Sequence, residues 1–98
     1  MIHNKVLKVV TEIAAAIDEG YQIIWTAEPK LLRWTWLCFK QEGDQEISQD
    51  WSIRLSEVKR LSSLDPRSDC LLDFVTGKIN AKETLVQIEK LEKLKAFW

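Results

Sequence analysis

The segment that decides the fold is Tyr21–Leu55, which reads YQIIWTAEPKLLRWTWLCFKQEGDQEISQDWSIRL and holds four of the five tryptophans. In its last part, apolar and polar side chains alternate almost strictly from Ile47 to Leu55. A period of two is typical of a strand with one buried face, whereas a helix would scatter the same residues around its circumference. The pattern therefore predicts a strand that turns Trp51 and Ile53 toward a core.

A tight turn at Gly43-Asp44 connects this strand to the tryptophan-rich run before it. Glycine at the first position of a two-residue loop suits the turns that close β-hairpins. Such a turn fixes the register of the two strands and places the large apolar groups of both on the same side. The expected pairs are Glu42 with Gln45, Trp36 with Trp51, Trp34 with Ile53, and Leu32 with Leu55.

A third strand is expected upstream, where Tyr21, Ile23 and Trp25 alternate with polar residues and Pro29 breaks the pattern. The three strands would form an antiparallel meander. Because Leu31, Leu32, Trp36 and Phe39 also fit a helical stripe, the alternative is a helix from Pro29 through Lys40 and a mostly α fold.

Both ends of the chain are expected to be helical. An apolar stripe at spacings of three and four runs from Ile2 to Ile17, with Gly20 as its C-cap, and should cover the tryptophan face. After the sheet we expect a short helix over Ser56–Leu64, a second after Asp65-Pro66 that ends at Gly77, and a last one capped by Asn80. The predicted fold class is α+β, in the order α-β-β-β-α-α-α, as a single globular domain over residues 1–98.

Composition excludes several classes of protein. The 46% hydrophobic and 30% charged residues of this 98-residue chain are ordinary for a folded domain. Charged residues interrupt every apolar stretch before it reaches the length of about 20 that a membrane span needs, so we expect no membrane partner. Cys38 and Cys70 are the only cysteines and lie in apolar segments without metal-ligand or redox spacing. Two reduced thiols and a cytoplasmic location are expected.

No catalytic constellation is visible. The single histidine, His3, has no nucleophile or orienting carboxylate placed beside it by a known motif. The three glycines are isolated, which argues against a phosphate-binding loop, and no short-range metal-ligand spacing occurs. We therefore expect no cofactor, no metal and no enzyme activity. A deep polar pocket around buried carboxylates would revive the enzyme class.

The sheet face opposite the tryptophans carries the functional hypothesis. There Arg33 would face Arg54, with Leu37 and Phe39 beside them, a combination typical of protein interfaces. Two facing arginines repel unless an anion lies between them, and Asp50 is the nearest candidate. The end of the last helix, with Trp98, offers a second apolar surface that packs on its own domain, on a second copy or on a partner. We thus predict a small protein-interaction or regulatory module, with self-association included, whose contact residues are Arg33, Leu37, Phe39, Arg54 and Trp98.

The alternative function is single-stranded nucleic acid binding through Arg33, Arg54, Phe39 and Lys40 on one sheet face. Against it, 14 Lys and Arg balance 15 Asp and Glu, and the isoelectric point is near 5.8. A nucleic acid interface usually shows a basic bias. The protein-interaction hypothesis is therefore preferred.

Overall fold

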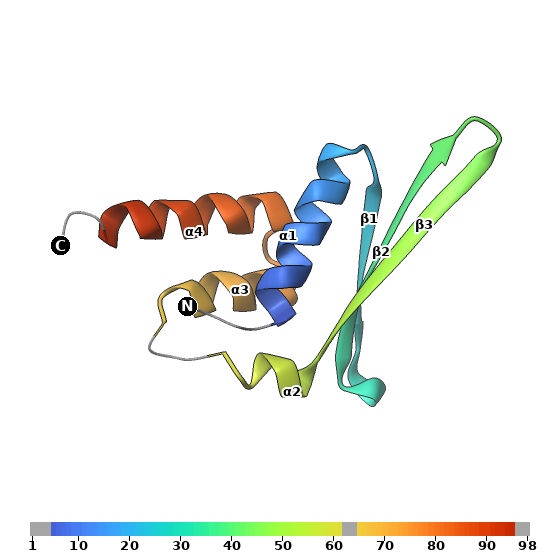
Figure 1. Cartoon of the computed structure of the whole chain (residues 1–98). Helices are drawn as coiled ribbons and strands as arrows, with labels where there is room; N and C mark the ends of the chain where they lie inside the picture. Colours follow the sequence, from blue (N-terminus) through green and yellow to red (C-terminus); the bar gives the residue numbers. More distant parts are fainter. Residues whose placement is uncertain (1–4, 62–64, 96–98) are drawn as a thin grey trace.

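The computed structural model describes residues 5–61 and 65–95, which form a three-stranded sheet with helices packed on one side of it (Figure 1). This confirms the predicted α+β class and the order of elements, with one short 3-10 turn added. The elements are α1 (Lys5–Asp18), β1 (Gln22–Glu28), η1 (Pro29–Leu31), β2 (Arg33–Glu42), β3 (Gln45–Arg54), α2 (Leu55–Val58), α3 (Arg67–Val75) and α4 (Ala81–Lys95).

The sheet is an antiparallel meander in the order β1-β2-β3. Its register confirms the hairpin prediction, because Glu42 pairs with Gln45 and Trp36 with Trp51. Gly43 has a φ of +60°, a left-handed conformation that glycine adopts without strain. A single turn residue thus sets which side chains of both strands face the core.

The alternative of a helix from Pro29 to Lys40 is wrong. Pro29 opens only the 3-10 turn, and the chain leaves it at Leu32, whose φ is +52°. The Leu32 carbonyl then accepts a hydrogen bond of 2.8 Å from the backbone N–H of Leu55. Leu31 and Leu32 are both exposed in this turn, so they belong to neither face of the sheet.

Three tryptophans bind the sheet to the helices through different partners. Trp36 stacks on Phe74 of α3, with ring centroids 4.7 Å apart and an angle of 3° between the planes. The Trp25 indole N–H donates to the Val75 carbonyl at 3.0 Å. The Trp51 indole N–H reaches the Glu12 carboxylate of α1 at 2.7 Å. Helix α1 therefore covers part of this face, as predicted, and α3 covers the part around Trp36.

The helix boundaries follow their capping residues. Gly20 and Gly77 both have positive φ just beyond α1 and α3, as expected for C-terminal glycines. The Asn80 side-chain oxygen accepts the Glu83 backbone N–H at 2.8 Å, which confirms the predicted cap of α4. Helix α2 is shorter than predicted and ends at Val58, and Leu64 lies outside the described residues.

Helix α4 packs on its own domain. Ala81, Thr84 and Ile88 are buried, and Leu85 and Leu91 lie against the core that α1 and α3 share with the sheet. Beyond Leu91, Leu94 is exposed, while Phe97 and Trp98 lie outside the described residues. None of the described helices has the length and apolar character to cross a membrane.

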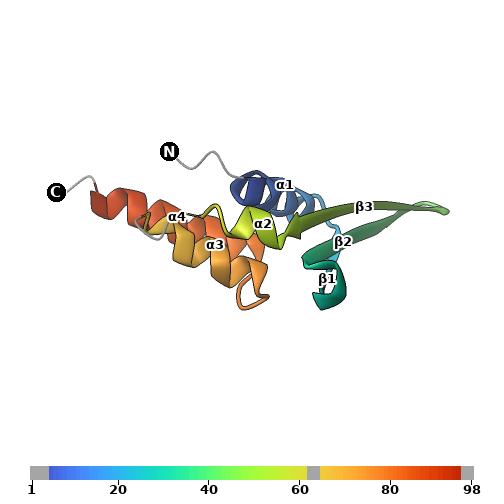
Figure 2. The same ribbon diagram turned by 90° about the horizontal axis from the view of Figure 1, so that it is seen from below.

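Viewed from below, the helices lie on one side of the sheet, and the β2–β3 hairpin extends away from them (Figure 2). Strand β1 begins at Gln22, which pairs with Phe39, so Gln41–Glu46 has no third strand beside it. All residues from Gln41 to Glu46 are exposed. We call this segment the hairpin arm.

Candidate functional site

The side of the sheet that faces away from the helices is its outer face (Figure 2). Because side chains alternate between the two faces along each strand, the register shows which residues lie on the outer face. They are Gln22, Ile24, Thr26 and Glu28 of β1, Arg33, Thr35, Leu37, Phe39 and Gln41 of β2, and Glu46, Ser48, Asp50, Ser52 and Arg54 of β3.

An apolar patch occupies the middle of the outer face. Ile24 pairs directly with Leu37, and these two side chains are 48% and 43% exposed. Phe39 follows Leu37 on the same face and is partly buried. Aliphatic and aromatic groups that remain this accessible beside one another are typical of interaction surfaces.

Charged groups lie at the end of this face where β1 meets β2. The Glu28 carboxylate accepts hydrogen bonds from the Thr35 hydroxyl at 2.5 Å and from Arg33 Nη2 at 3.1 Å. These two donors hold the pKa of Glu28 below its usual value. The anion that pairs with Arg33 is therefore Glu28 and not Asp50, and it lies on the β1 side of Arg33, away from Arg54. The Arg33 charge is therefore paired within the domain.

Arg54 is the exposed cation of this end. Its backbone N–H donates to the Glu57 carboxylate at 2.8 Å, which anchors the start of α2. Its side chain lies opposite Arg33 in the register and is exposed to solvent. Farther along the same strand the face carries the carboxylates of Asp50 and Glu46, so β3 has a cationic end and an anionic end.

Lys40 does not belong to the outer face, and its predicted placement is wrong. It pairs with Ile47 on the side of the tryptophans. Its ammonium group lies 2.9 Å from the Glu42 carboxylate and 4.9 Å from the centre of the Tyr21 ring. The Glu42 carboxylate raises the pKa of Lys40. Two of the cations in the nucleic-acid hypothesis are therefore not available on the outer face. Lys40 lies on the opposite face, and Arg33 is already paired with Glu28.

The structure brings four of the five predicted contact residues, Arg33, Leu37, Phe39 and Arg54, onto the outer face. Trp98 lies outside the described residues. Sequence reasoning overlooked Glu28, although its position beside Pro29 at the end of a predicted strand already placed a carboxylate near Arg33.

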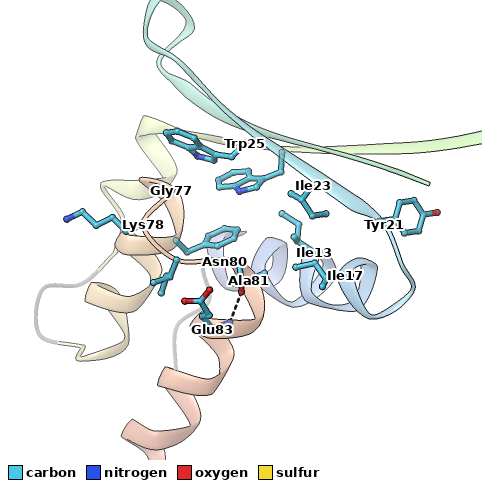
Figure 3. Close-up of a pocket in the computed structure, with 13 residues that line it drawn as sticks. Ile13, Ile17, Tyr21, Ile23, Trp25, Gly77, Lys78, Asn80, Ala81 and Glu83 are labelled. Atoms are coloured by element: carbon cyan, nitrogen blue, oxygen red, sulfur yellow. Dashed lines mark hydrogen bonds between the residues drawn. The ribbon is translucent and has the colours of Figure 1, made fainter. Parts of the chain in front are cut away.

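A cavity of about 380 Å³ lies between α1, β1 and the turn that joins α3 to α4 (Figure 3). Its walls are mostly apolar, and Ile13, Ile23 and Trp25 are among the side chains drawn. Asn80 and Glu83 are both exposed, and Asn80 is already engaged in capping α4. No sequence pattern points to this cavity, because its lining comes from segments far apart in the chain.

The two cysteine thiols are free and buried. Burial raises the pKa of the Cys38 thiol to about 11, and the nearby Asp50 charge adds to the effect. Burial likewise raises the pKa of Cys70. Within residues 5–61 and 65–95, no three His, Cys, Asp or Glu side chains gather where they could hold a metal ion.

The chain matches no protein-family model, and comparisons with curated proteins and with solved structures find no significant similarity. The function is therefore inferred from the geometry of the outer face.

Proposed function

We propose that this chain is a non-catalytic protein-interaction module of a regulatory kind, and that its outer face binds the partner. The observation that carries the proposal is the exposure of Ile24 and Leu37 at the centre of a sheet face that no described element covers. The opposite face already packs its tryptophans against helices. The outer apolar groups are thus left without a packing role inside the domain.

The composition of the face supports a protein partner. Apolar side chains at the centre with polar and charged groups around them match the anatomy of protein interfaces. Arg54 and Phe39 belong to residue types enriched there. Because the Arg33 charge is paired with Glu28, the face lacks the dense positive charge with which proteins bind phosphate backbones.

The proposal includes a cytoplasmic location. Cys38 and Cys70 are unpaired and buried, which suits a reducing compartment. Neither thiol needs a disulfide to hold the domain together, because both are part of apolar packing.

Affinity capture with a matched pair of variants tests the proposal. Leu37→Glu places a charge at the centre of the outer face, whereas Val86→Glu places one on an equally exposed position of α4. We expect the wild type and Val86→Glu to retain a defined protein from native lysate that Leu37→Glu loses. Retention of the same proteins by Leu37→Glu would contradict the proposal.

Nuclease treatment of the lysate distinguishes a protein partner from the alternative function, nucleic acid binding. A protein contact survives the treatment and depends weakly on salt, whereas binding to a nucleic acid falls steeply with salt. Recovery of bound RNA or DNA that Arg54→Glu abolishes would refute the protein-interaction proposal.

A further inference from the structure

We infer that the partner on the outer face is a second copy of this chain, related by a two-fold axis that crosses the strands at the level of Leu37. This inference rests on the proposed function and adds the identity of the partner. It commits to one arrangement, in which the two outer faces stack and their strands run in opposite directions.

The order of residues along the outer face is what suits it to its own copy. In the register, side chains form successive rows across the strands. The rows are Glu28–Arg33–Arg54, Thr26–Thr35–Ser52, Ile24–Leu37–Asp50, Gln22–Phe39–Ser48 and Gln41–Glu46.

The Leu37 row lies midway between the two charged rows. Arg33 and Arg54 lie four residues to one side of it, and Gln41 and Glu46 lie four residues to the other. At about 3.3 Å per residue, both offsets are about 13 Å. A two-fold rotation about the Leu37 row therefore places Arg54 of one copy over Glu46 of the other. Symmetry makes this contact twice.

The apolar centre also matches itself. Stacked sheets lie about 10 Å apart, a separation that facing aliphatic side chains fill. In the proposed arrangement Leu37 faces its own copy, as does Ile24, and Phe39 lies over Thr35 of the second copy. Arginine and glutamate side chains are long enough to meet across the same gap.

The other face-to-face axis, parallel to the strands, is less favourable. It would place the Asp50 carboxylate of one copy over Ile24 of the other, so a charged group would face an aliphatic side chain. It would also gather the four outer-face arginines, Arg33 and Arg54 of each copy, at one end, with only the two Glu28 carboxylates of that face to balance them. Charge complementarity therefore favours the antiparallel arrangement.

One repulsive contact remains in the proposed dimer. Asp50 lies in the central row on the edge strand β3, so the two Asp50 carboxylates face each other across the axis. Like charges in such a position oppose association. Neutralising Asp50 should consequently strengthen the dimer.

The size of the face sets the strength of the dimer. Three strands about 4.8 Å apart and rows spanning about 26 Å give roughly 400 Å² of facing area per copy. The area buried on both copies together, roughly 800 Å², lies below the range of about 1,200–2,000 Å² for standard stable interfaces. A weak, reversible dimer is expected. The hairpin arm supports it, because the proposed stacking covers one face of this two-strand segment, which has little support within its own domain.

Sedimentation equilibrium of the full chain, up to roughly 1 mM, tests the inference through a charge exchange. Arg54→Glu and Glu46→Arg should each weaken the dimer about tenfold or more, since each change creates two repulsive contacts. The double variant should recover to within about threefold of wild type, and Asp50→Asn should bind more tightly than wild type. Lys90→Glu on the exposed side of α4 is the control and should change nothing.

The arrangement would be overturned if the double variant did not recover the dimer affinity. It would also be overturned if Glu28→Arg restored the affinity of Arg54→Glu, because Glu28 and Arg54 meet only in the arrangement about the parallel axis. Circular dichroism and the thermal midpoint of each variant confirm that it is folded. If the wild type stays monomeric at every concentration while Leu37→Glu still loses a captured protein, the homodimer is refuted and the proposed function stands. If the chain dimerises but Leu37→Glu leaves both association and capture unchanged, both are refuted.

Discussion

The stacked pair of Trp36 and Phe74 joins the sheet to the helical layer, and its contribution to stability can be measured directly. The side chains are 3% and 1% exposed, and their rings lie parallel with centroids 4.7 Å apart. Stacked aromatic pairs contribute about 0.5–1.5 kcal/mol beyond the area they bury. Trp36→Leu and Phe74→Leu should each lower the free energy of unfolding by about 1–3 kcal/mol. The double variant should be more stable than the sum of the two losses predicts, by a coupling energy of about 0.5–1.5 kcal/mol.

Urea unfolding followed by far-ultraviolet circular dichroism measures all four proteins without depending on tryptophan fluorescence. Trp34→Leu combined with Phe74→Leu is the matched control, because Trp34 lies on the same strand and the same face as Trp36. Its coupling to Phe74 should be smaller. A coupling energy between Trp36 and Phe74 within about 0.3 kcal/mol of zero would refute the account of how the layers are joined.

Four further outcomes follow from individual residues. Gly77→Ala should destabilise the fold by about 1 kcal/mol or more in urea unfolding, because φ is +81° and a Cβ would lie 3.1 Å from the Trp25 ring; unchanged stability would contradict this. Asn80→Ala should cost about 1 kcal/mol through loss of the α4 cap, measured in the same way, whereas Asn80→Asp should retain most of it. Cys38, with a pKa of about 11, should react with iodoacetamide at pH 8 at least about 100 times more slowly in the folded than in the unfolded chain, as peptide mass spectrometry can follow, and equal rates would refute its burial. The pKa of Glu28 in the folded chain lies below its ordinary value of 4.5, so its stabilising effect is present above pH 4.5 and is lost as the pH falls through the folded pKa. Glu28→Gln should therefore flatten the acid side of the plot of unfolding free energy against pH. An unchanged plot would count against the ion pair.

Local chemistry explains why the sheet could be predicted from sequence. Period-two alternation assigned Trp51 and Ile53 to one face, and the turn at Gly43 then aligned Trp36 with Trp51 without any knowledge of the helices. Caps such as Asn80 likewise depend on contacts within a few residues. Four of the predicted contact residues share the outer face for the same reason.

Features that depend on packing between distant segments could not be predicted from the sequence. The division of the tryptophan face between α1 and α3 depends on how the helices pack on one another, which periodicity does not encode. The predicted grouping of Lys40 with Phe39 is wrong for a local reason, because adjacent strand residues point to opposite faces. The cavity beside Trp25 forms only where α1, β1 and the α3–α4 turn meet.

Methyl NMR spectra of the full chain, recorded as a function of its concentration, test the central claim most directly. Ile23 and Ile24 are neighbours in β1 but lie on opposite faces of the sheet, and only the second is on the outer face. If the outer face is the docking face for a second copy, the methyl signals of Ile24 and Leu37 shift with concentration while those of Ile23 and Ile53 stay fixed. Shifts confined to Val86 and Leu94 of α4, or none up to roughly 1 mM, would contradict the account.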